Sequence, residues 1–205
     1  MIKTIFFDFD GVLTIDGNGS GTICRNLQKT IPDIAYENMY ACYRQHLPLL
    51  LTGKAKHADI WNDFCTCVGK EIDSGLLPDA LKTTAKNEQM FALCRSLHKK
   101  YKLGIITDNG TERFELLIPE MQLTSLFDSI ILSGKIGSRK DEPYIFEKAL
   151  ASASCAADEC IFIDNYEKNL IVPAKMGFKT YFHDHHKNDV VSLRQWLEET
   201  GCTTS

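Results

Sequence analysis

The sequence of 205 residues lacks any long apolar run, since its apolar stretches reach only about five consecutive residues. A helix that crosses a membrane needs roughly 20 such residues, so we expect no membrane partner. The N-terminus also lacks the layout of a signal peptide and enters an apolar, strand-like run almost at once. These features favour a cytoplasmic protein.

An excess of positive charge is also missing. The 23 lysines and arginines are outnumbered by 27 acidic residues, which gives a formal net charge of −4. A protein that binds nucleic acid needs a basic patch or stripe to meet the phosphates, and none stands out here. We therefore expect no nucleic-acid partner. The sequence has no internal repeat, and it gives no indication of the oligomeric state.

Cysteine occurs eight times, but the spacing typical of a zinc site is absent. Cys65 and Cys67 lie two positions apart inside a helical pattern, and no second Cys or His pair follows at zinc spacing. Because the cytosol keeps thiols reduced, we interpret all eight as free thiols that pack as small apolar residues. The sequence HDHH at residues 183–186 suggests a metal site, but we favour an exposed loop.

Five short apolar runs are typical of strands that are buried on both faces of a parallel sheet. They cover residues 2–8, 103–107, 129–133, 160–164 and 179–182. Helical patterns accompany them at residues 86–100, 111–119, 143–153, 167–176 and 189–199. This alternation predicts an α/β fold whose core is a three-layer, Rossmann-like parallel sheet.

The interval between the first and second of these runs contains no convincing strand. Helical patterns fill it at residues 22–30, 35–46 and 56–68. Before them, the glycine-rich residues 16–21 indicate a flexible turn or hinge. We therefore predict an all-helical insert at residues 15–80, placed after the first strand. The α/β core would then consist of residues 1–14 and 81–205.

Polar side chains follow four of the predicted strands at their carboxyl ends, which is where ligands bind in open α/β sheets. They are Asp8 and Asp10 after the first strand, Thr107, Asp108 and Asn109 after the second, Lys140 after the third, and Asp164 and Asn165 after the fourth. Two carboxylates at the end of one apolar run repel each other, and burying either costs free energy. This pattern predicts a cation beside them.

The segment DFDGVLT at residues 8–14 resembles the first motif of the haloacid dehalogenase-like hydrolase superfamily, in its subfamily I phosphatase branch. Thr107, Lys140 and Asp164 have the order and strand context of that family's other three motifs. The resemblance extends over essentially the whole chain. The predicted insert is similar to the helical cap of the family.

The resemblance implies a phosphatase that hydrolyses a small phosphorylated metabolite through an aspartyl-phosphate. Asp8 would be the nucleophile, and Asp10 would act as general acid and then as general base. Thr107 would hydrogen-bond a phosphoryl oxygen, and Lys140 would neutralise charge on the transferring group. Thr107, Asp108 and Lys140 would form the substrate-binding set.

The resemblance also implies Mg²⁺ as cofactor, a hard cation that prefers oxygen ligands. Asp8, the main-chain carbonyl of Asp10, and Asp164 would hold the ion. Mg²⁺ and Lys140 together would make the paired carboxylates tolerable. Asn165 replaces the second acid that is common in the family, so the surroundings of the metal are expected to differ.

Three alternative functions remain open. A phosphomutase of the same fold would keep all these groups and differ only in excluding water from the aspartyl-phosphate. A haloacid dehalogenase needs neither Mg²⁺ nor a general acid at the position of Asp10, so this residue argues against it. A non-catalytic binding protein is less consistent with a complete set of catalytic groups.

Overall fold

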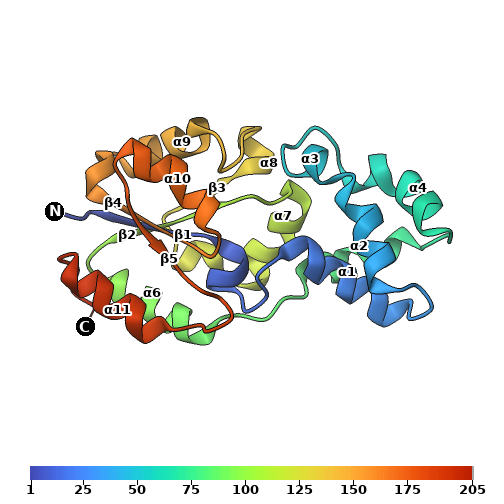
Figure 1. Ribbon diagram of the computed structural model, residues 1–205, viewed down its shortest axis with the longest axis horizontal. Coiled ribbons are helices and arrows are strands. Elements are labelled where there is room, and N and C mark those ends of the chain that lie inside the picture. The colour runs from blue at the N-terminus through green and yellow to red at the C-terminus, as the bar shows by residue number, and fades with distance from the viewer. Residues whose placement is uncertain (205) are drawn as a thin grey trace.

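A five-stranded sheet lies at the centre of the computed structural model, which describes residues 1–204 (Figure 1). Its strands are β1 (Thr4–Phe7), β2 (Lys102–Thr107), β3 (Ser129–Leu132), β4 (Cys160–Asp164) and β5 (Lys179–Phe182). All neighbours pair in parallel in the order β3-β2-β1-β4-β5, as the alternation of strands and helices predicted. Strand β1 therefore lies in the middle, at the point where the chain changes direction across the sheet.

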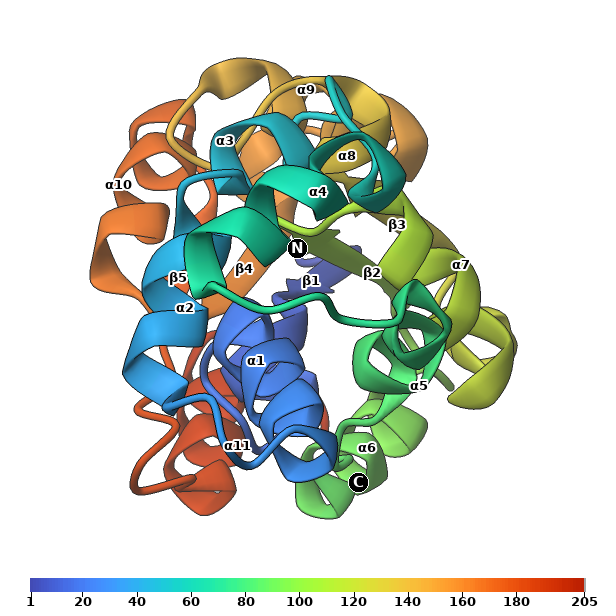
Figure 2. The same ribbon diagram turned by 90° about the vertical axis from the view of Figure 1, so that its right-hand side faces the viewer.

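Helices cover both faces of the sheet, which gives the predicted three layers (Figures 1 and 2). One face carries α6 (Glu88–Leu97), α7 (Thr111–Glu120) and α11 (Val190–Glu199), and the other carries α9 (Pro143–Ala153) and α10 (Glu167–Met176). Side chains of β1 alternate between the two layers, because successive residues of a strand point to opposite faces. Ile5 and Phe7 join the first apolar cluster, while Phe6 joins the second.

Six α-helices lie between β1 and β2 in the chain, and the first five of them pack beyond the carboxyl ends of the strands (Figure 1). These five are α1 (Gly19–Thr30), α2 (Tyr36–Arg44), α3 (Leu47–Leu50), α4 (His57–Val68) and α5 (Leu77–Lys82). We call residues 19–82 the helical segment. It has its own apolar cluster, which includes the buried side chains of Leu27, Met39 and Phe64.

The start of the helical segment differs from the prediction of a flexible turn at residues 16–21. Gly19 and Gly21 already belong to α1, and Asn18 caps the helix by accepting a hydrogen bond from Gly21 N at 3.3 Å. Tertiary packing overrides the turn signal here. A side chain at Gly19 would collide with Arg113 and Asp10, so only glycine lets the helix begin at this place.

The two chain connections between the core and the helical segment run side by side. Thr14 and Lys86 form an isolated antiparallel bridge, and Ile15 N donates to the Ala85 carbonyl at 3.1 Å. Farther into the core, Asn87 N donates to the Leu13 carbonyl at 2.9 Å. The chain thus leaves the core and returns to it through one paired junction.

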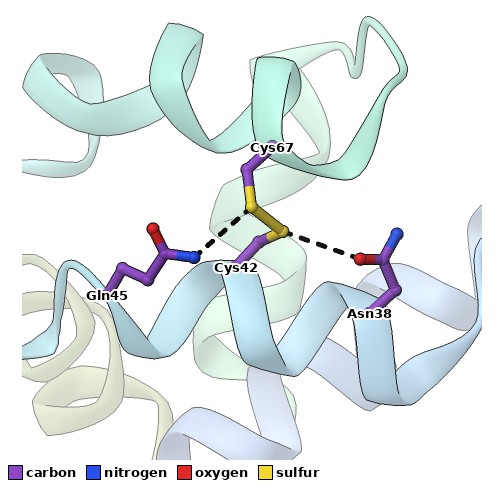
Figure 3. The surroundings of a disulfide bond; sticks show 4 residues. All are labelled: Asn38, Cys42, Gln45 and Cys67. Atoms are coloured by element: carbon purple, nitrogen blue, oxygen red, sulfur yellow. Dashed lines mark hydrogen bonds between the residues drawn. A yellow bond between two sulfur atoms is a disulfide. The ribbon is translucent and has the colours of Figure 1, made fainter.

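The cysteines correct a second expectation. Cys42 on α2 and Cys67 on α4 form a disulfide, with their Cα atoms 5.7 Å apart (Figure 3). The interpretation of all eight cysteines as free thiols is therefore wrong for these two, while the other six are free. The amide of Gln45 donates to Cys67 Sγ at 3.5 Å. Local spacing gave no signal, because the pair forms only where α2 packs on α4.

Short helical turns complete the fold. They are Phe9–Leu13, Ser74–Leu76, Leu123–Ser125, Ser133–Ile136 (α8) and Ala157–Glu159. The longest helices, α1 and α4, have 12 residues each. Within residues 1–204, none of the helices combines the length and apolar character needed to span a bilayer.

Candidate active site

A cavity of about 370 Å³ lies between the carboxyl ends of the strands and the helical segment. Its lining from the core includes Asp8, Asp10, Thr107, Asp108 and Lys140. Its lining from the helical segment includes Ile23, Tyr40, Tyr43, Arg44, Leu47, Leu50, Leu51 and His57. The structure thus brings together the polar residues that follow β1, β2 and β3, as their place at one edge of the sheet predicted.

Lys140 joins two of the predicted acids. Its Nζ atom lies 2.8 Å from Asp8 Oδ1 and 2.6 Å from Asp164 Oδ2. The two acids are neighbours because β1 and β4 pair in parallel, with Phe7 opposite Ile163. The lysine side chain is only 2% exposed and Asp164 is fully buried. One buried cation therefore faces two buried carboxylates.

The cluster of Asp8, Asp164 and Lys140 has more carboxylates than cations. Burial raises the pKa of Asp8 to about 8; Lys140 opposes this rise and Asp164 adds to it. Burial alone would lower the pKa of Lys140, but Asp164 and Asp8 raise it above its usual value, so the lysine stays charged. Without a further cation, Asp8 would be largely protonated at neutral pH and a poor nucleophile.

The oxygen atoms around Asp164 fit such a cation. Asn165 Oδ1 is buried and has no hydrogen-bond partner among residues 1–204, while Asn165 Nδ2 donates to the Gly17 carbonyl at 3.2 Å. Asn169 Nδ2 donates to Asp164 Oδ1 at 3.0 Å and so orients the carboxylate. The carboxylates of Asp8 and Asp164, and the unpartnered amide oxygen of the residue that follows Asp164, are all oxygen donors of the kind that a hard divalent cation prefers.

No group of three or more His, Cys, Asp or Glu side chains suited to a metal occurs in the described part of the chain. The predicted magnesium site is different in kind. Its predicted ligands are the carboxylates of Asp8 and Asp164 and the main-chain carbonyl of Asp10, with Asn165 expected only to alter the surroundings of the ion. The residues present therefore fit Mg²⁺ better than a softer metal that prefers nitrogen or sulfur ligands.

Asp10 belongs to a second, separate charge pair. Its carboxylate faces the guanidinium of Arg113, with Nη1 at 2.6 Å from Oδ2 and Nη2 at 2.8 Å from Oδ1. Asn109 Nδ2 donates to Asp10 Oδ2 and to Thr107 Oγ1, both at 2.9 Å. The network links two predicted site residues, Asp10 and Thr107, through an amide.

Arg113 is a site residue that was not predicted, whereas Asn109 was expected at this edge of the sheet but was given no role. Arg113 lies on the buried face of α7 beside Phe114 and Leu117, in a pattern that otherwise holds apolar residues. The sequence did contain a signal for Arg113, since it lies on the apolar face of a helix that follows a predicted site strand. A buried arginine needs an acidic partner, so this position indicates an acid nearby.

Asp108 contacts the segment that carries Lys140. Its Oδ1 accepts a hydrogen bond from Lys140 N at 3.0 Å, and its Oδ2 accepts one from Arg139 Nε at 3.1 Å. These bonds place the lysine above the end of β2. The extra negative charge of Asp108 is thus paired with Arg139, and its predicted part in binding the substrate stays a prediction.

The haloacid dehalogenase-like hydrolase family matches residues 5–182, which is most of the chain. The protein belongs to this hydrolase family. The match begins inside β1 and ends with β5, so it covers the whole sheet and the helical segment. The resemblance noted from the DFDGVLT motif is confirmed.

Curated proteins similar to this hydrolase include two phosphatases. The glyceraldehyde 3-phosphate phosphatase of Pyrococcus abyssi is 33% identical over 89 residues, 42% of this chain and 37% of the relative. Bifunctional epoxide hydrolase 2 of Mus musculus is 28% identical over 133 residues, 62% of this chain and 24% of the relative. The glyceraldehyde 3-phosphate phosphatase of Methanothermobacter thermautotrophicus is 25% identical over 182 residues, 80% of this chain and 77% of the relative. The first two matches span less than half of each relative's length.

Solved structures of the family share the fold. A predicted HAD-like hydrolase from Porphyromonas gingivalis has a TM-score of 0.73 at 22% identity and covers 96% of this chain and 98% of its own. A HAD family enzyme from Bacteroides thetaiotaomicron, in complex with magnesium and inorganic phosphate, has a TM-score of 0.68 at 18% identity over 90% of this chain and 96% of its own. The L-2-haloacid dehalogenase of Xanthobacter autotrophicus has a TM-score of 0.67 at 17% identity over 94% of this chain and 83% of its own.

The HDHH loop of this hydrolase is only partly exposed, so the predicted exposed loop is wrong for His183. That histidine is 1% exposed, and its Nε2 lies 3.1 Å from Asn188 Oδ1. His185 is half-buried, and its Nδ1 lies 3.4 Å from Asn165 Nδ2. The loop therefore packs against the residues that follow β4 and does not extend into solvent as a whole.

Proposed function

We propose that this hydrolase is a Mg²⁺-dependent phosphatase that acts on a small phosphorylated metabolite through an aspartyl-phosphate on Asp8. The observation that carries the proposal is the separation of two acids with different partners. Asp8 shares Lys140 with Asp164 at 2.8 and 2.6 Å, whereas Asp10 is paired with Arg113. A nucleophile and a general acid–base need such distinct surroundings.

The first step forms the intermediate. Asp8 attacks phosphorus, and the bond between phosphorus and the leaving-group oxygen breaks while its electron pair stays on that oxygen. Asp10 gives a proton to the same oxygen. Lys140 stabilises the charge that spreads over the phosphoryl oxygens, and Thr107 donates its hydroxyl hydrogen to one of them.

The second step releases phosphate. Asp10, now ionised, takes a proton from a water molecule that attacks phosphorus, and the bond to Asp8 breaks. Asp8, Asp164 and the carbonyl of Asp10 would hold Mg²⁺, with Asn165 beside it. The ion would supply positive charge to the phosphoryl oxygens and keep Asp8 ionised.

The helical segment, residues 19–82, would act as the cap that selects the substrate, close to the insert expected at residues 15–80. A cavity of about 370 Å³ suits a small metabolite. Its wall on the segment side is mostly apolar and aromatic, and Arg44, at 5.6 Å over the ring of Tyr40, adds a positive charge. We therefore favour a compact ester with an apolar portion beside the phosphate.

The relatives support phosphatase chemistry over the alternatives. Three of the similar curated proteins are named glyceraldehyde 3-phosphate phosphatase. The likeness to the magnesium and phosphate complex at 18% identity and that to L-2-haloacid dehalogenase at 17% identity both concern the fold alone, so Asp10, which a dehalogenase does not need, is what argues against the dehalogenase. A phosphomutase remains the alternative that would use the same groups.

Release of inorganic phosphate from a panel of sugar and organic-acid phosphates tests the proposal. We expect turnover that requires Mg²⁺ and is abolished in Asp8→Asn. The matched control is Asp63→Asn, which makes the same change at an exposed position of α4. Phosphate release that continues in Asp8→Asn, or release from no ester in the presence of Mg²⁺, would contradict the proposal.

A further inference from the structure

Arg113 is a buried charge to which the proposed mechanism assigns no task. Arg113 lies in the first turn of α7, and its side chain is only 2% exposed. Burial alone would lower the pKa of the guanidinium, but Asp10 raises it above its usual value, so the group remains charged. A buried arginine is costly unless its hydrogen bonds are made and its charge is paired.

The guanidinium is held by partners from several parts of the chain. Besides the two bonds to Asp10, Nη1 donates to Asn109 Oδ1 at 2.7 Å, and Nε donates to the Leu81 carbonyl of α5 at 3.3 Å. The guanidinium carbon lies 5.8 Å from the centre of the Phe9 ring. These contacts fix the plane of the guanidinium, and a two-bond pair in turn fixes the plane of the carboxylate.

The pairing separates Asp10 from the nucleophile cluster. In the described part of the chain, Lys140 forms ion pairs with Asp8 and Asp164 and none with Asp10. A carboxylate that is free to rotate would compete for that lysine, or for the cation beside it. Arg113 binds the Asp10 carboxylate with two hydrogen bonds and so holds it away from Lys140.

The contacts also distinguish the two oxygens of Asp10. A carboxylate oxygen has two acceptor positions. On Oδ2 both are used, by Arg113 Nη1 and Asn109 Nδ2, whereas Oδ1 accepts, among residues 1–204, only from Arg113 Nη2. Oδ1 therefore keeps one position at which a proton can be carried toward the leaving group.

We propose that Arg113 is a positioning residue that acts through Asp10: it keeps this carboxylate off the Asp8–Lys140–Asp164 cluster and presents Oδ1 to the leaving-group oxygen. The inference rests on the proposed phosphatase function. In the step it serves, the proton moves from Oδ1 to the oxygen whose bond to phosphorus is breaking. That oxygen keeps the electron pair of the bond.

The helical segment takes part in this arrangement. Arg113 bonds the carbonyl of Leu81 in α5, and Gly19 of α1 lies so close that an added Cβ would be 2.1 Å from Arg113 Nη1. The pair of Arg113 and Asp10 is thus enclosed by two helices of the segment. Its geometry depends on how the segment is seated on the core.

The leaving group provides the test. An alkyl phosphate departs as a strongly basic alkoxide and needs a proton, whereas p-nitrophenyl phosphate departs as a stable anion and does not. Loss of a general acid therefore affects kcat/KM for the first substrate and spares the second. A merely structural role of Arg113 would affect both equally.

We would measure kcat/KM with Mg²⁺ for Arg113→Met on p-nitrophenyl phosphate and on an alkyl phosphate that the wild type hydrolyses. We expect a loss on the alkyl phosphate of about 10²- to 10⁴-fold, the range for a general acid–base, mainly in kcat. On p-nitrophenyl phosphate kcat/KM should stay within about threefold of the wild type. Arg113→Lys, which keeps the charge without the two-bond geometry, should lose less on the alkyl phosphate than Arg113→Met. Arg95→Met, at an exposed position of α6, is the control.

A double variant separates the outcomes further. In the Asp10→Asn background, Arg113→Met should cause no additional loss on the alkyl phosphate, because both changes remove the same function. Equal losses on the two substrates, or additive losses in the double variant, would overturn the inference and leave the phosphatase standing. If Arg113→Met fails to fold, the same comparison is made with Arg113→Lys. A wild type that hydrolyses no ester would overturn the proposed function and this inference together.

Discussion

At the scale of single residues, the site contains two buried cations that are assigned to different acids. Lys140 faces Asp8 and Asp164, and Arg113 faces Asp10. A buried ion pair adds little net stability, but removing one partner leaves the other charge uncompensated. The two halves of the pair between Asp10 and Arg113 should therefore depend on each other for stability as well as for catalysis.

We expect Asp10→Asn and Arg113→Met each to lower the free energy of unfolding by about 3–5 kcal/mol, the usual effect of breaking a buried pair. The double variant should lose less than the sum of the single variants, because it leaves no unpaired charge. Urea unfolding followed by circular dichroism measures all three. Strictly additive losses would mean that the two charges are screened from each other.

The sequence revealed the residues that follow strands and missed those held by helices. Asp8, Thr107 and Asp164 could be predicted because each ends a fully apolar run, and parallel strands carry such residues to one edge. The role of Arg113 could not be predicted, because the orientation of its side chain depends on how α7 packs against Phe9. Asn109 follows β2, so its place at the edge was evident, but its role was not, since its amide is positioned by contacts with Asp10 and Arg113.

At the scale of elements, one hydrogen-bonded chain joins the helical segment to the core. Glu112 Oε2 of α7 accepts from His57 N at 2.8 Å and lies 2.7 Å from His57 Nδ1. His57 Nε2 lies 2.8 Å from the hydroxyl of Tyr43 on α2. The ionised carboxylate can only accept, so Nδ1 carries a hydrogen. Three helices therefore meet at one imidazole.

Glu112→Ala should loosen this junction, because it removes an acceptor shared by two donors of His57. Hydrogen bonds to charged groups contribute about 1.5–3 kcal/mol, so amide exchange at the start of α4 should become faster by roughly one to two orders of magnitude. Hydrogen–deuterium exchange measures this, with Glu115→Ala on the exposed face of α7 as the control. Unchanged exchange at His57 would mean that the apolar contacts alone seat the segment.

The disulfide between Cys42 and Cys67 should stabilise the helical segment, since it closes a loop with a sequence separation of 25 residues. For a loop of this length, we expect reduction, or the variant Cys42→Ser/Cys67→Ser, to lower the free energy of unfolding by roughly 3–4 kcal/mol. Unfolding with and without dithiothreitol measures the effect, and the double serine variant should not respond to the reductant. A wild type that is equally insensitive would contradict the expectation.

The disulfide between Cys42 and Cys67 is also relevant to the cellular location of the protein. Disulfides are rare where glutathione and thioredoxin keep thiols reduced, so the pair argues against the cytoplasmic location expected from the sequence. That location stays a proposal. Alkylation of thiols in freshly lysed cells, followed by mass spectrometry of the Cys42 and Cys67 peptides, decides whether the bond exists in the cell.

At the scale of the whole molecule, the binding of a cation should be linked to pH through Asp8. Burial raises its pKa to about 8, above its usual value near 4. Between these two pH values the folded, metal-free protein keeps a proton on Asp8 that the unfolded chain has released. Proton binding to Asp8 therefore stabilises the folded state fully below about pH 4, and this stabilisation is lost as the pH rises to about 8. In the proposed site Mg²⁺ would replace that proton, so its binding should grow stronger over the same range.

We therefore expect the increase in Tm caused by Mg²⁺ to become larger between about pH 5 and pH 8. Differential scanning calorimetry with Mg²⁺ or with EDTA measures it. Asp8→Asn, which cannot ionise at this position, should show a smaller increase that is independent of pH. An increase in Tm of the wild type that stays constant across this range would show that Asp8 is already ionised without the cation.

The fold as a whole was predicted better than its details. Five strands, their parallel pairing and the helical interval after β1 were evident, because runs such as CIFID and LGIIT allow no amphipathic alternative. The short helices α3, α5 and α8 were missed, because four to six residues show too little periodicity. The helix start at Gly19 was missed because the packing of that glycine on Arg113 outweighs its preference for turns.

The paired junction at Thr14 and Lys86 has a consequence for how such enzymes diversify. The chain enters and leaves the helical segment through adjacent hydrogen-bonded strands of backbone, and the segment has an apolar cluster separate from the two that flank the sheet. A foreign insert whose ends lie equally close together can be spliced in at this point if it keeps the two contacts that reach the site, the Leu81 carbonyl that Arg113 bonds and the close approach of Gly19. Chimeric proteins cut here, with these two positions retained, offer a practical route to new substrate preferences.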